Sequence, residues 1–269
     1  MFPVIKGERF VKDANGNILG GHIKEERLLR EHPKELSYIL GVLCGDGYIA
    51  HYHYKRNGKI VSYYVFGIHV ADADFAKSVF ETLKKLGLSP RINVNRYCKV
   101  TVTNKSFYTI LSKALLNLEA YVASPLDFVR GFYESEGNLQ ISKRKDRSSP
   151  SIRVRIVNTK KELLELVQKF LREFGIESSI RLHYRARKRL RNGKEINEKG
   201  CYVLDIHGGG RVIKFLELIK PCIYRKGLIF LQNQLNHYIL RRSFNIRKEV
   251  MCYGVPSSAG PVLLPDIPQ

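Results

Sequence analysis

One apolar segment of the chain, residues 36–47, reads as a helix that ends abruptly at a carboxylate followed by glycine. Gly41 and Gly45 lie four residues apart and therefore share one face of that helix. A glycine inside a helix costs about 1 kcal/mol relative to alanine, and small residues remove the side chains that hold packed helices ~8–10 Å apart. The pattern therefore predicts that a second helix packs closely on this face. Asp46 adds an anion at the negative end of the helix, which favours a cation nearby.

A matching segment occurs 90 residues later, at 125–137. Gly131 and Ser135 repeat the spacing of the two small residues, and Glu136 repeats the acid before a glycine. The downstream sequence Leu-Gly-Leu at 86–88 also has a counterpart, Phe-Gly-Ile, 88 residues further on. The chain is therefore an internal repeat, and its two helices are expected to pack on each other through small residues. The predicted helix interface consists of Gly41, Gly45, Gly131 and Ser135.

The repeated segments resemble the motif of the LAGLIDADG homing endonucleases, in the single-chain form that carries two motifs. Residues 39–47 and 129–137 each match the nine-residue motif, with the acid in its eighth position, and the similar layout covers roughly residues 35–240. The resemblance implies an α+β fold of two pseudo-symmetric αββαββα half-domains. Each half would contain a curved antiparallel sheet, and the two motif helices would form the interface between the halves.

The order of predicted elements agrees with that layout. We expect an N-terminal extension at 1–31, a first half-domain at 32–122, a second at 123–242 and a C-terminal tail at 243–269. The extension is predicted to hold a hairpin within 8–20 and a helix at 24–31. After the first motif helix come strands 48–55 and 60–70, helix 73–86, strands 90–96 and 98–103, and helix 105–118. The second half repeats this order with helix 125–135, strands 138–145 and 150–157, helix 160–174, strands 179–188 and 200–207, and helix 211–220. A further helix is predicted at 225–242, followed by a loose, proline-rich tail at 254–269.

The charge of the chain indicates a polyanionic partner. Its 269 residues include 46 Lys and Arg against 25 Asp and Glu, which gives a formal net charge of +21. Without such a partner, the mutual repulsion of these positive charges would only oppose folding into a compact structure. No apolar run of about 20 residues and no signal peptide is apparent, so nucleic acid is favoured over a membrane surface. The five cysteines are odd in number and lack zinc-type spacing, which is typical of buried apolar residues in a reducing compartment such as the cytoplasm or an organellar matrix.

Alternating polar and apolar residues indicate that several predicted strands have one solvent-facing side. These sides are rich in Arg, Asn, Gln, Ser and His, which can read base edges in the major groove. An ordinary solvated sheet face is the alternative, but such a face would contain more acidic residues. The segment 181–199 holds eight Lys and Arg against two acids, and we expect it to form a hairpin arm along the phosphates. The residues predicted to contact nucleic acid are His51, His53, Lys55, Arg91, Asn93, Asn95, Lys99, Thr101, Asn138, Gln140, Ser142, Arg144, Arg153, Arg155, Arg181, His183, Arg185, Arg187, Lys188, Arg189 and Arg191.

Pairing of the two motif helices would bring Asp46 and Glu136 together at one end. Two close carboxylates repel each other, so one is driven toward its neutral form unless a cation intervenes. A hard divalent ion with oxygen ligands fits such a site, and we expect Mg²⁺ or Mn²⁺. The resemblance implies that both acids are catalytic metal ligands, and that the backbone carbonyls of Gly45 and Ser135 also lie near the metal. Either acid alone could equally be a helix-terminal residue before a capping glycine, but two at matching places favour a shared site.

The resemblance also implies a basic residue near the metal, whose position the motif does not define. Lys99 is the first candidate, and Arg153, Arg155 and His69 follow. His51 and His53 share a strand face and could hold a metal, although contact with a groove or with solvent is the preferred interpretation. Cys44, inside the first motif helix, is expected to serve packing.

The leading hypothesis is a monomeric homing endonuclease that makes a metal-dependent double-strand break in a long DNA target and leaves short 3′ overhangs. An intron RNA maturase and a DNA-binding regulator on the same scaffold are the alternatives. Both acids favour the enzyme, because a protein that only binds gains nothing from two anions facing phosphate. ATP use has no support, since a glycine-rich phosphate loop is missing, and the terminal residues of a self-splicing intein are missing as well.

Overall fold

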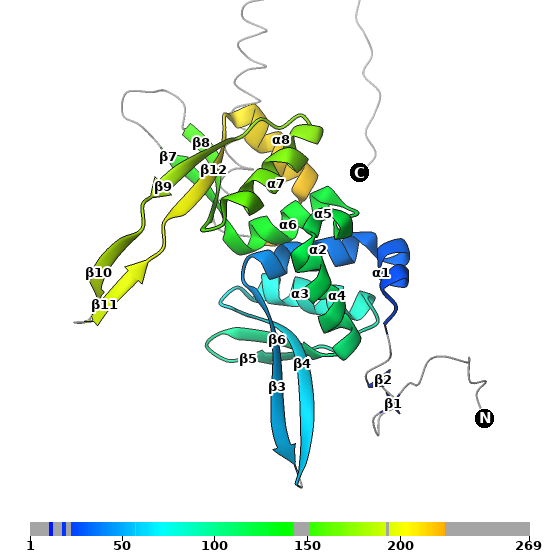
Figure 1. The fold of residues 1–269 in the computed structure, drawn as a ribbon. Coiled ribbons are helices and arrows are strands. Elements are labelled where there is room, and N and C mark those ends of the chain that lie inside the picture. Colours follow the sequence, from blue (N-terminus) through cyan, green and yellow to red (C-terminus); the bar gives the residue numbers. More distant parts are fainter. Residues whose placement is uncertain are drawn as a thin grey trace, which may run out of the picture. The chain divides into compact units, whose positions relative to one another are not determined.

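The computed structural model describes residues 11–12, 18–19, 23–56, 58–142, 151–191 and 194–223. The predicted helix at 225–242, the tail at 254–269 and Arg144 lie outside these residues. The described part is an α+β structure in which two four-stranded antiparallel sheets are flanked by helices, as predicted (Figure 1). It belongs to one compact unit, residues 1–224, which contains the described helices and strands of both halves of the repeat.

The first half follows the predicted order of elements. Its parts are α2 (Pro33–Cys44), β3 (Gly47–Arg56), β4 (Lys59–Val70), α3 (Ala73–Lys85), β5 (Arg91–Val94), β6 (Cys98–Thr103) and α4 (Lys105–Leu116). Its strands are arranged in the order β3-β4-β6-β5. The short helix α5 (Leu118–Tyr121) then leads to the second half. Ahead of this half, β1 (Val11–Lys12) pairs with β2 (Ile18–Leu19), as the predicted hairpin requires, and α1 (Glu25–Glu31) ends before the proline that begins α2.

The second half repeats the same order. Its parts are α6 (Pro125–Glu136), β7 (Gly137–Ser142), β8 (Ser151–Asn158), α7 (Lys161–Glu173), β9 (Ser179–Tyr184), β10 (Arg187–Arg191), β11 (Lys194–Glu198), β12 (Cys201–His207) and α8 (Gly209–Ile219). The strand order of its main sheet, β7-β8-β12-β9, corresponds to that of the first sheet. The starts of α3 and α7 are 88 residues apart, which matches the repeat seen in the sequence.

The basic segment of the second half differs from the prediction. One continuous hairpin is expected there, but β9 ends at Tyr184, and β10 and β11 pair with each other as a separate two-stranded sheet. The pairing of β12 with β9 shifts register between Cys201 and Tyr202. Such an irregularity increases the local twist of a strand pair, so the outer part separates from the main sheet. Both this pair and the outer part of β3–β4 extend as two-stranded arms (Figure 1).

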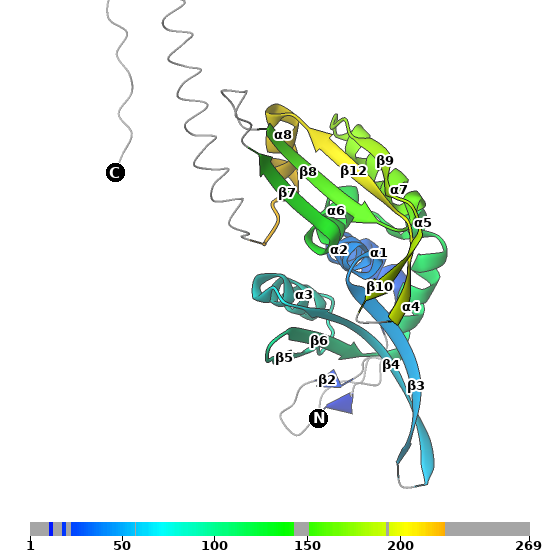
Figure 2. The same ribbon diagram turned by 90° about the vertical axis from the view of Figure 1, so that its left-hand side faces the viewer.

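The motif helices α2 and α6 pack on each other at the centre of the unit, between the two sheets (Figure 2). Each sheet has one face packed on helices and one face turned away from them, which we call the open face. In the first sheet Phe66, Ile68 and Val100 are buried on the packed face, near α3 and α4. In the second sheet Val154 and Ile206 are buried in the same way near α7 and α8.

Alternation predicted the packed and open faces of β6 and of the edge strands β5 and β9 correctly, but the packed side is fully buried only in the central strand. Along β6 the apolar residues are buried and the polar residues between them are exposed or partly exposed. In the edge strands β5 and β9, however, the exposed fractions are 63% for Val94 and 45% for Leu182. An edge strand has a neighbour on only one side, so the helices cover it less completely.

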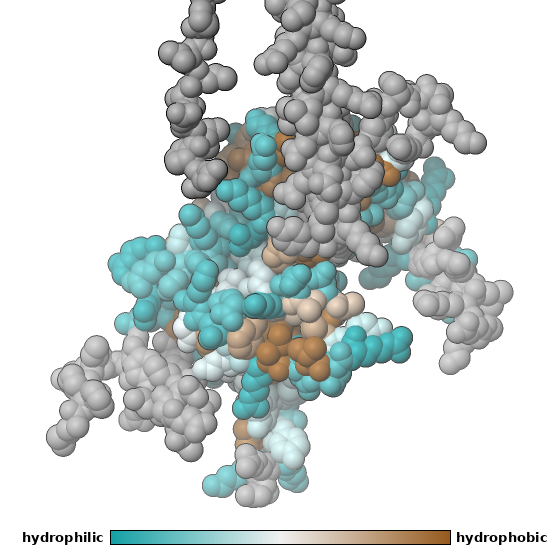
Figure 3. Space-filling view, turned by 180° about the vertical axis from the view of Figure 1, so that it is seen from behind, coloured by the Kyte–Doolittle hydropathy of each residue, from teal (hydrophilic) through white to brown (hydrophobic). Residues whose placement is uncertain are grey.

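The surface of the described residues is largely hydrophilic when seen from behind, with a smaller hydrophobic patch (Figure 3). Among the described helices, none combines the length and the apolar character that crossing a membrane requires.

Candidate active site and nucleic-acid interface

Glycines bring the backbones of α2 and α6 into direct contact. A Cβ atom added to Gly41 would lie 2.1 Å from the carbonyl oxygen of Phe128, and one added to Gly131 would lie 2.2 Å from that of Tyr38. No side chain can occupy either position without moving backbone atoms. Both glycines therefore lie where the backbones of α2 and α6 approach each other most closely.

The ends of the two helices bring the second small residue of each motif and the acids together. A Cβ added to Gly45 would lie 2.3 Å from Ser135 Cβ and 3.2 Å from Glu136 Cγ. The Ser135 hydroxyl donates a hydrogen bond to the Gly131 carbonyl at 3.0 Å, so this hydroxyl is used within its own helix. Asp46 is close enough to Glu136 for their like charges to interact. The structure thus places both acids at one end of the helix pair.

Glu136 has a raised pKa, which is the main electrostatic feature of this end. Burial raises the pKa of its carboxyl, the negative charge of Asp46 raises it further, and together they bring it to about 7. A hydrogen bond from Asn158 acts in the opposite direction, with Nδ2 donating to Glu136 Oε1 at 3.3 Å. A carboxylate in this position is poorly stabilised by the protein alone.

Two residues beside the acids were not predicted from the sequence. Asn158 is the last residue of β8, and its Oδ1 accepts a hydrogen bond from the backbone N–H of Lys160 at 2.9 Å. The positive charge of Lys160 acts on Cys44, although burial of that thiol dominates and raises its pKa to about 12. Because Cys44 is two residues from Asp46, Lys160 lies at the same end of α2. The only signal available in the sequence was a polar residue that follows the alternating part of a predicted strand.

The donor set suits a hard divalent cation that is only partly held by side chains. No group of three or more His, Cys, Asp or Glu side chains within the described ranges could hold a metal ion. Two carboxylates with oxygen donors and a poorly compensated negative charge do fit Mg²⁺ or Mn²⁺. Backbone carbonyls, water or substrate oxygens would have to complete the coordination.

A second acid of α6, Glu134, is almost fully buried and holds the two motif helices together. The Tyr38 hydroxyl of α2 donates to Glu134 Oε2 at 2.6 Å, and the backbone N–H of Cys222 donates to Glu134 Oε1 at 2.7 Å. The same Tyr38 oxygen is hydrogen-bonded to Ser78 of α3 at 3.0 Å. The Arg130 guanidinium lies 4.5 Å from the centre of the Tyr38 ring. This network positions α6, and its hydrogen bonds join α6 to α2, to α3 and to the segment after α8.

The open face of the first sheet gathers several of the predicted nucleic-acid contacts. Across β4, β6 and β5, Lys99 pairs with His69 on one side and with Asn93 on the other, and Thr101 pairs with Arg91. Lys99 therefore stands in the middle of this face, and its catalytic role stays a prediction. Asn95 lies in the turn after β5.

His51, His53 and Lys55 differ from the expectation, because the register places them on the other side of β3. His51 pairs with Tyr64, and both belong to the side that carries Phe66 and Ile68. The His51 ring stacks on the Tyr64 ring at 4.2 Å and lies 6.2 Å from the ring of Tyr108 in α4. The open face of this arm carries tyrosines instead, among them the exposed Tyr52 and Tyr54. His51 and His53 do share a face, as predicted, with ring centres 4.7 Å apart.

The open face of the second sheet holds its basic residues in hydrogen-bonded pairs. The Arg153 Nε donates to Gln140 Oε1 at 2.8 Å. Arg155 and Arg181 both contact the buried Asp205, which the sequence analysis did not identify. Asn138 and Ser142 are exposed on β7, and Arg185 is exposed between β9 and β10.

The basic arm pairs along its whole described length. Arg187 pairs with Glu198, and Arg191 pairs with Lys194 at the outer end. The Lys188 Nζ lies 2.9 Å from Glu195 Oε1, and both side chains are mostly exposed. The side chains of Arg187, Arg189 and Arg191 lie outside the described atoms, so their predicted phosphate contacts stay predictions.

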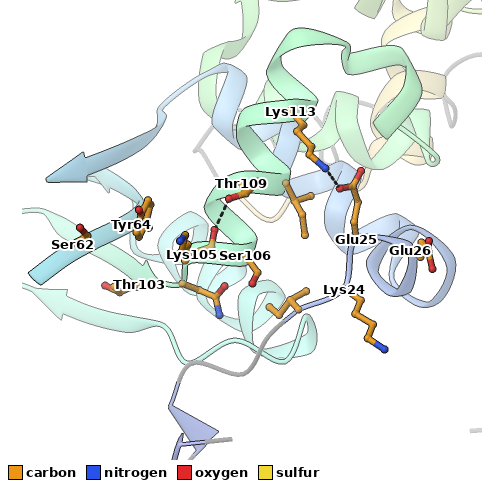
Figure 4. Close-up of a pocket in the computed structure, with 13 residues that line it drawn as sticks. Lys24, Glu25, Glu26, Ser62, Tyr64, Thr103, Lys105, Ser106, Thr109 and Lys113 are labelled. Atoms are coloured by element: carbon orange, nitrogen blue, oxygen red, sulfur yellow. Dashed lines mark hydrogen bonds and ion pairs between the residues drawn. The ribbon is translucent and has the colours of Figure 1, made fainter. Parts of the chain in front are cut away.

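A cavity of about 870 Å³ lies in the first half but does not include the acids (Figure 4). It is lined by residues of α1, β4 and α4, and Lys113 Nζ forms an ion pair with Glu25 Oε2 at 2.8 Å across it. The acids instead lie at the end of the α2–α6 pair, where Asp46 is exposed and Glu136 is partly exposed.

Comparisons with known proteins give a family match in the second half of the described chain. Residues 124–220 match the family described as LAGLIDADG-like domain. An uncharacterized protein of Methanocaldococcus jannaschii is 35% identical over 211 residues, which cover 71% of this chain and 68% of the relative. A second from the same organism is 30% identical over 176 residues, which cover 59% of this chain and 61% of that relative.

The homing endonuclease I-DmoI of Desulfurococcus mucosus is 26% identical over 193 residues, which cover 68% of this chain and 86% of I-DmoI. A structure of mesophilic variants of I-DmoI matches with a TM-score of 0.49 at 25% identity, over 70% of this chain and 89% of that chain. A crystal structure of I-DmoI in complex with DNA and Mn matches with a TM-score of 0.48 at 24% identity, over 70% and 96% of the two chains.

Proposed function

The chain belongs to the LAGLIDADG family, and we propose that it is a metal-dependent endonuclease that cuts both strands of a long, specific DNA target. The observation that carries this proposal is the meeting of Asp46 and Glu136 at one end of the α2–α6 pair, where burial and like charge raise the pKa of Glu136. A fold gains no stability from such a pair, so its use is expected to be chemical.

The two acids would hold the divalent cation, and the carbonyls of Gly45 and Ser135 would add oxygen donors. When bound, Mg²⁺ or Mn²⁺ lowers the pKa of water and stabilises negative charge that develops on phosphate. I-DmoI has been crystallised with DNA and Mn, which supports a divalent cation for this chain. Asn158 orients Glu136 through its hydrogen bond, and Lys160 is a candidate for balancing charge beside the acids. Lys99, on the open face of the first sheet, stays the candidate basic residue for catalysis.

The open faces of the two sheets would bind the DNA, because both expose basic and amide-bearing side chains, such as Lys99 and Asn93 on the first sheet and Arg181 and Asn138 on the second. Arginine can pair with guanine and an amide side chain with adenine in the major groove. The net charge of +21 supports contact with many phosphates. One chain supplies both motif helices, so it is expected to act on DNA as a monomer. The likeness to the homing endonucleases further implies that the cut leaves short 3′ overhangs.

The test separates binding from cleavage. A target is first selected from a random duplex library in EDTA, and the selected duplex is then incubated with Mg²⁺. Wild type is expected to cut both strands, whereas Asp46→Asn and Glu136→Gln should bind the duplex and cut it several orders of magnitude more slowly. Glu35→Gln removes a carboxylate from the opposite end of α2 and should leave cleavage unchanged. Wild-type rates in the double variant Asp46→Asn/Glu136→Gln would refute the assigned site, and binding without any cleavage by wild type would favour a regulator.

A further inference from the structure

A buried carboxylate lies in the middle of the open face of the second sheet. Asp205 is on β12, the strand between β8 and β9, and its side chain has 0% of its surface exposed. Asp205 pairs directly with Arg155 on β8, and both side chains lie on the same side of the sheet as that of Arg153. An anion at this place opposes the binding of DNA phosphates, so its presence requires another physical reason.

The contacts of Asp205 show what it does to its neighbours. The Arg155 Nε donates to Asp205 Oδ1 at 3.1 Å, and both Nε and Nη2 of Arg181 lie 3.1 Å from Oδ2. These arginines come from the two strands that flank β12, so one carboxylate holds a guanidinium on each side. His183 and His207 lie at the margin of the cluster, with His183 Nδ1 3.5 Å from Arg155 Nη2 and His207 Nε2 4.0 Å from Oδ2.

The two arginines differ in the exposed fraction of their side chains, and therefore in how much of each can contact a partner. The Arg155 side chain is 13% exposed, whereas that of Arg181 is 51% exposed. A guanidinium has five N–H donors in a fixed planar arrangement, more than the contacts of Arg181 with Asp205 use. Holding one edge of this plane fixes the direction of the donors on the other edge. Removing that hold would return to Arg181 the rotational freedom of an ordinary surface arginine.

We propose that Asp205 is a specificity-determining positioning residue, which directs Arg181 toward a base edge instead of leaving it as a mobile phosphate contact. This inference rests on the proposed function, because it requires that the open faces bind DNA. A buried ion pair is weak evidence for a role in stability, and in some proteins such pairs serve the geometry that they impose. Bidentate arginine contacts to guanine need such a fixed plane, whereas phosphate contacts do not.

The first sheet offers a matched comparison at the same place in the repeat. Gly67 is the position 88 residues before Arg155, and it pairs with Thr101 as Arg155 pairs with Asp205. Neither residue of the first pair is charged. The substitution Thr101→Val therefore perturbs the corresponding place on the other open face without touching the Asp205 cluster.

The experiment measures base discrimination rather than affinity alone. The duplex selected by wild type in EDTA is remade with every single base-pair change, and affinities are measured for wild type, Asp205→Asn, Arg181→Lys and Thr101→Val. Asp205→Asn should lose about 5- to 150-fold discrimination at one or two neighbouring base pairs, the range of a good bidentate contact. Arg181→Lys keeps the charge but not the planar fork, and it should lose discrimination at the same base pairs. Thr101→Val should leave those base pairs unaffected.

Affinity for random-sequence DNA gives the complementary readout. Asp205→Asn removes an anion and frees arginines, so this affinity should be kept or increased. The slope of the logarithm of the binding constant against the logarithm of the salt concentration should become steeper by about 1. Unchanged discrimination in Asp205→Asn at every base pair would overturn the proposal. If a thermal melt shows that Asp205→Asn is not folded, the test passes to Arg181→Lys, whose substituted side chain is half exposed. Unchanged discrimination in Arg181→Lys would overturn the proposal equally. A wild type that selects a site but does not cut it with Mg²⁺ would contradict the proposed function and leave this inference intact.

Discussion

The raised pKa of Glu136 makes a quantitative prediction about the stability of the metal-free chain. The usual pKa of this carboxyl is 4.5, and in the folded chain burial and the charge of Asp46 raise it to about 7. The folded state therefore binds the proton more tightly than the unfolded state does. Folding is favoured while the carboxyl is protonated, and this contribution is lost as the pH rises from 4.5 to about 7.

The size of the loss follows from the size of the shift. Each pKa unit corresponds to about 1.36 kcal/mol, so the shift of Glu136 should cost about 3 kcal/mol of unfolding free energy above pH 7. Glu136→Gln retains the shape of the side chain but cannot ionise. In EDTA the variant should therefore be about 3 kcal/mol more stable than wild type at pH 8, with the difference nearly absent below pH 4.5. Asp46→Asn removes one cause of the shift and should give an intermediate result at pH 8.

Urea denaturation at pH 4.5 and pH 8, followed by circular dichroism, measures these differences directly. Added Mg²⁺ should reduce the advantage of Glu136→Gln at pH 8, because an ion that binds the ionised acids stabilises only wild type. Parallel pH profiles for wild type and Glu136→Gln would refute the reasoning, since the two carboxyls would then not share a poorly solvated site.

Three further predictions concern packing and charge. Gly131→Ala should destabilise the fold by about 1–3 kcal/mol or more, because the new Cβ would meet the backbone of α2. Its control is Gly210→Ala, where the added Cβ meets open space, and this variant should change the midpoint of thermal unfolding little. Tyr38→Phe removes a donor from the buried Glu134 carboxylate and should cost about 1–3 kcal/mol in urea denaturation, and a neutral result would show that the network adds no stability. Deleting residues 187–198 should weaken binding to many DNA sequences alike and flatten the salt dependence of the binding affinity, measured by fluorescence anisotropy. Loss of cleavage with intact affinity would contradict the phosphate-binding role of the arm.

The sequence by itself determined the parts of this protein that depend on local pattern. Gly41 and Gly131 predicted the helix pair, because only glycine permits backbones to touch, and the motif spacing then required that the two acids meet at one end. Alternation in the central strand β6 predicted which side would be buried, since period two has a direct geometric cause. The turn glycines, among them Gly58 and Gly87 with positive φ, also lie where the sequence predicted the chain to turn.

Only the tertiary structure decided how side chains from distant strands combine. Asp205 lies between arginines that are 50 and 24 residues away in sequence, and the strand order β8-β12-β9 is what brings them together. The direction of His51 was likewise decided by the register of β3 on β4, because a shift of one residue moves a side chain to the opposite face. The pKa of Glu136 depends on how deeply the helix pair is buried, a long-range property that no local pattern contains.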